Sequence, residues 1–175
     1  MICGYFDVQG FYHNGIFYSR EFALLGKHGC SVYSVDHGLK WEMLSEQEKL
    51  SAMHCIHFVH GLPFTGRDGL ALNKVRGLIR SFWAVHSDPE HMFMGIKSPE
   101  AEAVLRKCSI PCINLTKYGA TWTAIRGSTS PCYQHVRDGK CSYVAVNGMK
   151  QWVKKNMEGQ QDHFIFGDVD WSIKK

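Results

Sequence analysis

The stretch MICGYFDVQGFYHNGIFYSREFALLG, residues 1–26, decides the fold, because it places two apolar segments on either side of a turn signal. The run 1–7 alternates apolar and small residues and leads into Gly10, which predicts a short buried strand that ends in a turn. After His-Asn-Gly at 13–15, the run 16–26 predicts a second strand. The two strands should form a hairpin at the start of the chain.

Within the second strand of this hairpin we expect a bulge near Ser19 and Arg20. A third strand is expected over 30–35, where β-branched and aromatic residues dominate. After this strand the spacing of apolar residues changes from that of strands to that of helices. The helices expected further along the chain cover 45–61, 71–86, 98–107 and 141–157, and the strands cover 91–97 and 111–116. This order predicts an α/β fold, a mixed sheet flanked by helices, in a single domain over residues 1–175.

The composition excludes several classes of protein. The chain has 175 residues, hydrophobic and charged fractions of 45% and 21%, and a net charge of +4. No stretch approaches the roughly 18 apolar residues of a membrane span, and the N-terminus lacks the basic lead and apolar run of a secretory signal. Seven scattered cysteines, an odd number, do not suggest a disulfide framework. We therefore expect an intracellular protein without membrane contact, whose thiols are reduced or bind metal.

The loop CYQHVRDGKC, residues 132–141, contains three side chains that bind metals, Cys132, His135 and Cys141. They are either unrelated loop residues or part of a tetrahedral zinc site, which needs a fourth ligand. Glu21 lies inside the apolar second strand, and a buried carboxylate needs a partner. It is an exposed residue of the strand face, one half of an ion pair, or that fourth ligand.

A second group of such side chains, His54, His57 and His60, follows within the first expected helix. His54 and His57 share one helix face, and the three rings could hold an ion. However, no carboxylate lies close in sequence, and Met53 and Phe58 suggest packing. We therefore predict histidines that are satisfied beside the core.

The order of the motifs resembles a known family. The leading strand with FDVQG, the second strand with a glutamate before Ala-Leu-Leu, and a late C-x2-H followed by a cysteine that opens a long helix are similar to the exonuclease-like domains of the DEDDh superfamily. Two groups of such domains, the arenavirus nucleoprotein exonuclease and the Maelstrom domain, carry a Glu-Cys-His-Cys zinc site. The resemblance spans about residues 7–152 and implies an RNase H-like fold. It also implies a structural zinc ion held by Glu21, Cys132, His135 and Cys141.

The same resemblance implies that the catalytic site is degenerate. Nucleases of this superfamily hold two divalent ions with four carboxylates and use a histidine as general base. Here Asp7 is followed by Gln9 in place of a glutamate, Glu100 is the only acidic candidate for the next position, and Lys140 stands where the general base is expected. The last acidic position falls within 144–147, which contains no carboxylate. Mg²⁺ or Mn²⁺ would be needed only if the site were active.

We expect the protein to bind RNA or another single-stranded nucleic acid. The expected surface is the groove around Asp7, Gln9 and Glu100, and the expected phosphate contacts are Arg76, Arg80 and Lys140. Tyr118 and Trp122 could stack on a base, although core packing is favoured for both.

Two other functions stay open. The first is an active ribonuclease, either metal-dependent or cleaving RNA as Maelstrom-type domains do. In that case His163 and Asp168, which have the H-x4-D spacing of the superfamily but lie beyond the last helix, would fold back into the groove. The second is a protein-interaction scaffold with no nucleic-acid role.

Overall fold

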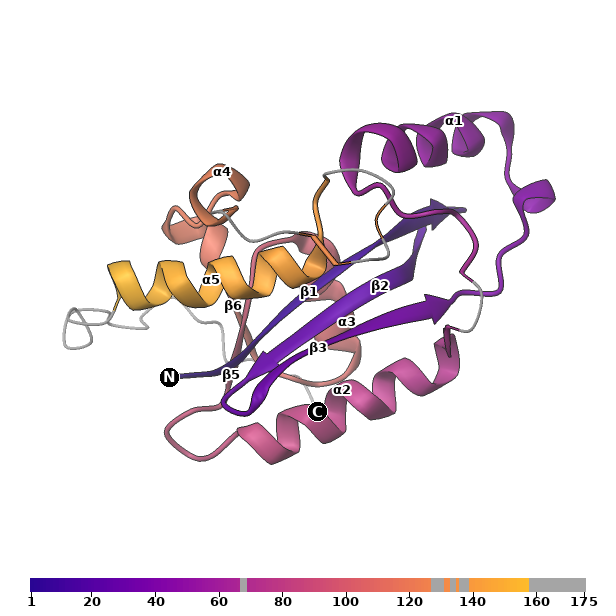
Figure 1. The fold of residues 1–175 in the computed structure, drawn as a ribbon. Coiled ribbons are helices and arrows are strands. Elements are labelled where there is room, and N and C mark those ends of the chain that lie inside the picture. The colour runs from indigo at the N-terminus through magenta and orange to yellow at the C-terminus, as the bar shows by residue number, and fades with distance from the viewer. Residues whose placement is uncertain (67–68, 127–130, 133–134, 136–138, 158–175) are drawn as a thin grey trace.

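A six-stranded mixed sheet, in the order β4-β3-β2-β1-β5-β6, forms the centre of the computed structural model (Figure 1). The structure describes residues 1–66, 69–126, 131–132, 135 and 139–157. The strands are β1 (Ile2–His13), β2 (Ile16–Gly26), β3 (Gly29–Asp36), β4 (Leu70–Ala71), β5 (Phe93–Ile96) and β6 (Cys112–Asn114). The first three strands are antiparallel, whereas β5 and β6 continue the sheet from β1 in parallel and β4 pairs in parallel with β3. The predicted α/β class with a mixed sheet is therefore confirmed.

The first two strands form the predicted hairpin, and its details follow from local sequence. Asn14 and Gly15 both have positive φ angles, 49° and 71°, as the tight two-residue turn of a hairpin requires. The register changes from Gln9 opposite Glu21 to Gly10 opposite Ser19, so Arg20 is the extra residue of a bulge, as expected.

The expectation that the first strand ends in a turn at Gly10 is wrong. β1 continues through Gly10 to His13. A Cβ atom at position 10 would overlap the carbonyl group of Tyr18 on β2. The glycine therefore permits a close approach of the two strands beside the bulge, rather than a turn.

The helices are α1 (Glu46–His54), α2 (Leu72–His86), α3 (Pro99–Lys107), α4 (Trp122–Ile125) and α5 (Ser142–Asn156). Short 3₁₀ turns cover Trp41–Met43 and Leu115–Tyr118, and a π-helical turn, Cys55–Val59, follows α1 directly. The predicted capping box of Ser45 and Glu48 starts α1, and the Ser98 side chain caps α3. None of the helices in the described ranges is long and apolar enough to cross a membrane.

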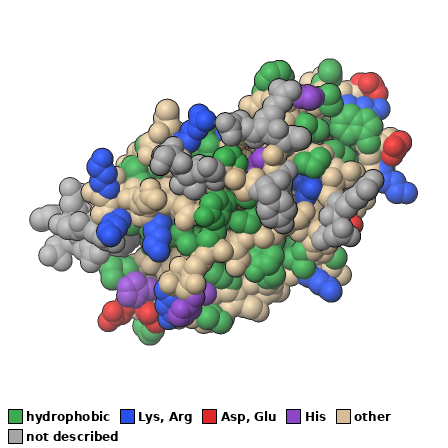
Figure 2. All heavy atoms as spheres, in the orientation of Figure 1, with side chains coloured by type: hydrophobic (Ala, Val, Ile, Leu, Met, Phe, Trp, Pro, Cys, Tyr) green, Lys and Arg blue, Asp and Glu red, His purple; other side chains and the backbone are tan. Residues whose placement is uncertain are grey.

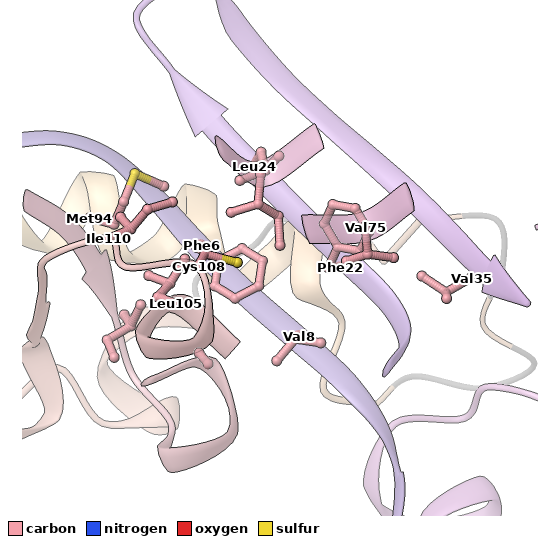
Figure 3. Close-up of a cluster of buried hydrophobic side chains, with 13 residues drawn as sticks. Phe6, Val8, Phe22, Leu24, Val35, Val75, Met94, Leu105, Cys108 and Ile110 are labelled. Carbon is pink, nitrogen blue, oxygen red and sulfur yellow. The ribbon is translucent and has the colours of Figure 1, made fainter. Parts of the chain in front are cut away.

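The two faces of the sheet bury different helices, because alternate residues of a strand point to opposite faces. On one face, α2 and α3 cover the cluster that Figure 3 shows, in which Phe6 and Val8 of β1 meet Phe22 and Leu24 of β2. On the other face, α4 and α5 cover a second cluster that includes Tyr5, Ala23, Leu25, Ala145 and Met149. By the same alternation, Asp7, Gln9 and Glu21 belong to the face that α5 covers.

The segment 45–61 differs from its expected structure. The α-helix ends at His54, and Ala52 is the one buried residue of α1. Met53 is 42% exposed and Phe58 is 77% exposed, so the expected packing of these two side chains is wrong. The spacing of apolar residues predicted the helix but not which side chains would reach the core.

Candidate metal centre

Glu21, Cys132, His135 and Cys141 meet at one point between β2 and the start of α5. Each offers one ligand atom, and these four atoms all lie within 4.8 Å of one another. The Cys132 thiol donates to Glu21 Oε2 at 3.0 Å, and His135 Nε2 lies 3.1 Å from each Glu21 oxygen. The structure thus gathers the four ligands that the sequence predicted into a group that could hold a metal ion.

The bulge and the start of α5 together position the carboxylate of Glu21. Glu21 is the first residue after the bulge that pairs with β3, opposite Ser34, and its side chain is fully buried. The backbone N–H of Ser142, the first residue of α5, donates to Glu21 Oε1 at 3.1 Å. Because the N-terminus of a helix attracts negative charge, α5 favours the ionised carboxylate.

His135 is oriented from the side opposite Glu21. Its Nδ1–H donates to the backbone carbonyl of His60, which leaves Nε2 directed at the carboxylate. A hydrogen bond of this kind fixes the tautomer and ring orientation of metal-binding histidines. The imidazole is therefore prepared to bind an ion through Nε2.

The end of the π-helical turn contacts Gly139 and Lys140, just before α5. The Lys140 backbone N–H donates to the carbonyl of Val59 at 2.7 Å. A Cβ atom at Gly139 would lie 2.9 Å from that same oxygen, so a larger residue would push the loop away. Sequence reasoning missed this contact. The His-Gly pair at 60–61, which follows a helical pattern, was the only local signal.

The side chain of His60 is buried and fully hydrogen-bonded. Its Nδ1 accepts from the Leu62 N–H at 3.0 Å, and its Nε2 donates to the Gly10 carbonyl at 3.3 Å. Burial lowers the pKa of His60 to about 4, so the ring is neutral. The prediction of a satisfied histidine is confirmed for His60, whereas His54 and His57 are exposed.

The charges of the cluster favour metal ligation. Burial opposes the charged form of His135, but hydrogen bonds with Cys141 and Glu21 outweigh it and raise the pKa to about 10. The hydrogen bond from Cys132 lowers the pKa of Cys141 to about 4, which gives the thiolate. Burial raises the pKa of Glu21, yet hydrogen bonds and the charge of His135 lower it overall. A bound cation would replace the proton on His135, so we expect metal binding to release protons.

Asp7 lies on the same face of the sheet but in a separate pair. The Lys97 ammonium lies 3.2 Å from Asp7 Oδ1, and Gln9 Nε2 donates to Asp7 Oδ2 at 2.9 Å. Lys97 also lies 5.3 Å from the ring centroid of Trp122, which is partly buried, as expected. Burial raises the pKa of Asp7 even though Lys97 opposes the shift. Sequence reasoning missed Lys97, although a lysine directly after a buried strand was a visible signal.

The other expected groove residues do not gather around Asp7. Glu100 lies on α3, against the opposite face of the sheet, and accepts a hydrogen bond from Tyr12 at 3.0 Å. Arg76 and Arg80 lie exposed on α2, which also covers that opposite face. Lys140 is exposed directly before Cys141, one of the four candidate metal ligands. The expected groove with all of these residues is therefore not formed, and His163 and Asp168 lie outside the described residues.

Comparisons of the chain with protein-family models, with curated proteins and with solved structures find no match.

Proposed function

We propose that the chain is a zinc-stabilised domain with an RNase H-like fold that binds RNA or another single-stranded nucleic acid and does not cleave it by two-metal catalysis. The observation that carries the proposal is the contrast between two buried carboxylates on one face of the sheet. Glu21 faces two thiols and an imidazole, whereas Asp7 faces an ammonium group.

The donor set supports zinc. Two thiolates, one imidazole and one carboxylate match the ligand types and the number of a closed tetrahedral zinc site. Four protein ligands leave no coordination position for water or substrate, so the ion has a structural role. It connects β2, near the start of the chain, with the loop before α5, more than a hundred residues later.

The surroundings of Asp7 argue against a catalytic ion. A hard divalent cation would have to displace the buried Lys97 ammonium. Its protein ligands would then be one carboxylate, Asp7, and the neutral amide of Gln9. Gln9 already uses its amide N–H on Asp7, and Glu100 is bonded to Tyr12 elsewhere. These contacts argue against hydrolysis by two-metal catalysis.

The nucleic-acid part of the proposal rests on charge. The net charge is +4, and a basic protein surface binds phosphate with a characteristic dependence on salt. A leading antiparallel meander extended in parallel by β5 and β6 also supports the RNase H-like expectation.

A labelled single-stranded RNA tests the proposal. It should bind the zinc-loaded protein with an affinity that falls as salt increases, and it should keep its length with Mg²⁺, Mn²⁺ or EDTA. Metal-dependent shortening that Asp7→Asn abolishes would overturn the non-catalytic part and favour the ribonuclease. The absence of both binding and cleavage would favour the interaction scaffold.

A further inference from the structure

The charge of the chain is strongly uneven along the sequence. Between residues 108 and 157, after the end of α3, there are seven Lys and Arg residues and one acidic residue, Asp138. This segment supplies the 3₁₀ turn Leu115–Tyr118, α4 and α5, which lie on the same face of the sheet. We call the exposed surface of these three elements, with Lys140, the α4–α5 face.

Six cations of this face are exposed, and none of them forms an ion pair with a carboxylate among the residues that the structure describes. They are Lys117, Arg126, Lys140, Lys150, Lys154 and Lys155. In Figure 2, Lys and Arg side chains lie over α4 and α5, whereas the visible Asp and Glu side chains lie toward the edges of the view. Lys150 and Lys154 are one helical turn apart and so form a row along α5.

Aromatic side chains lie between these cations. Tyr118 is 44% exposed, and Trp122 and Trp152 are partly buried. A Cβ atom at Gly119 would be 3.8 Å from the Trp152 ring, so the 3₁₀ turn and α5 are in close contact. Single-stranded nucleic acids are bound by cations that follow the backbone and by aromatic rings that stack on bases.

From this arrangement we infer that the α4–α5 face is the surface that binds the phosphate backbone of single-stranded nucleic acid. The inference rests on the proposed function and names its site. It replaces the groove expected from the sequence, because the cations of that groove lie on different faces of the sheet.

The competing basic surface is α2, which carries Lys74, Arg76 and Arg80. Its surroundings are mixed in charge. Asp88 and Glu90 follow the helix, and the neighbouring α3 carries Glu102 as well as Arg106 and Lys107. A polyanion would meet both signs of charge there, whereas the described part of the α4–α5 face has cations alone.

An anionic membrane is a weaker fit than a nucleic acid. Helices that lie on membranes need an apolar face that is free to insert. The apolar residues of α5, which include Ala145, Val146 and Met149, are buried against the sheet. The helix therefore exposes a row of lysines but no apolar face that is free to insert.

The test compares two triple variants that change the charge by the same amount. Lys150→Glu, Lys154→Glu and Lys155→Glu reverse three charges on α5, and Lys74→Glu, Arg76→Glu and Arg80→Glu reverse three charges on α2. With labelled single-stranded RNA, the α5 variant should bind at least tenfold more weakly than the α2 variant. If the three lysines contact phosphates, its salt dependence should also be less steep, by roughly 2 in the log–log slope. Zinc content and melting temperature check that both variants are folded.

The outcomes separate the inference from the function on which it rests. If the wild-type protein does not bind RNA, the proposed function fails, and the inference fails with it. If the wild-type protein binds but the α2 variant loses as much affinity as the α5 variant, or more, the inference alone is overturned. Wild-type protein that binds phosphatidylserine vesicles through the α5 lysines, and does not bind RNA, would also overturn it.

Discussion

The ammonium group of Lys97 lies 3.2 Å from Oδ1 of Asp7, and only 9% of the lysine side chain and none of the aspartate side chain is exposed. Lys97 directly follows β5, and Asp7 lies in the middle of β1, which pairs with β5 in the sheet. Asp7 therefore has a cation that belongs to the protein. This pair satisfies the charge of Asp7 without a metal ion.

Replacement of Lys97 by methionine should destabilise the protein by about 3 kcal/mol, because it leaves a buried carboxylate without its counter-charge. Adding Asp7→Asn should recover most of that loss, and urea unfolding of both single variants and the double variant measures the coupling. Lys49→Met is the matched control, since its partner Glu46 is 88% exposed. It should cost less than about 1 kcal/mol. Equal losses for Lys97→Met and Lys49→Met would contradict the interpretation.

Glu21→Gln should lower the zinc content of the purified protein well below one ion per chain, because the amide keeps the size of the side chain but removes its charge. Elemental analysis measures the content. Glu100→Gln, a carboxylate bonded to Tyr12 on another face, should leave it unchanged. Full zinc occupancy in Glu21→Gln would mean that another residue supplies the fourth ligand.

Removal of the metal with a chelator should lower the melting temperature, since an ion that binds only the folded chain adds its binding free energy to folding. Structural zinc sites contribute on the order of 10 kcal/mol in small domains, and we expect a smaller loss here because the sheet has two cores of its own. Added zinc should restore the melting temperature of the wild-type protein but not that of Cys132→Ser. Cys112→Ser, which alters a cysteine outside the cluster, should behave as the wild type. A melting temperature that does not change when the chelator is added would exclude a structural metal.

His37 should stay neutral at pH values where an ordinary histidine becomes charged. Burial lowers its pKa from the ordinary value of 6.5, while its Nε2 donates to the Phe64 carbonyl at 2.7 Å. Below about pH 6.5 the unfolded chain then binds more protons than the folded one, so the free energy of unfolding falls as the pH falls. NMR titration of the ring should give a pKa under 6.5, and His37→Gln should make stability less sensitive to acid. A pKa above the ordinary value would refute this assignment.

Two glycines inside helices should respond to alanine in opposite directions. A Cβ atom at Gly148 in α5 would overlap the Ile125 carbonyl at the end of α4, so Gly148→Ala should destabilise the protein. Gly77 in α2 has no atom within 4 Å of that position. Gly77→Ala should stabilise it by roughly 0.5–1 kcal/mol, because alanine loses less conformational entropy in a helix. Thermal unfolding measures the stability of both variants. Stabilisation by Gly148→Ala would show that α4 does not pack tightly on α5, and destabilisation by Gly77→Ala would contradict the open space at that position.

Features that depend on a few neighbouring residues were predictable. The turn at Asn14-Gly15, the capping box of Ser45 and Glu48 and the bulge at Arg20 each involve contacts within a short stretch, and the structure contains all three. The ligands Cys132, His135 and Cys141 could be read from one loop for the same reason. Glu21 came from the order of motifs in a resemblance, because no local pattern connects a strand residue with a loop more than a hundred residues later.

The sequence by itself therefore determined the longer strands and helices, their order and the chemical types of the candidate metal ligands, but not the short elements β4 and α4. The tertiary structure alone decided that Lys97 pairs with Asp7, that the carbonyl of His60 orients His135, and that Arg76 lies on the far face of the sheet from Asp7. Periodicity shows that a helix or strand has two sides, but it does not show which side meets which partner. That choice depends on strand order and register, which arise from many weak contacts between distant segments. These contacts also set which charges become buried pairs and which stay exposed.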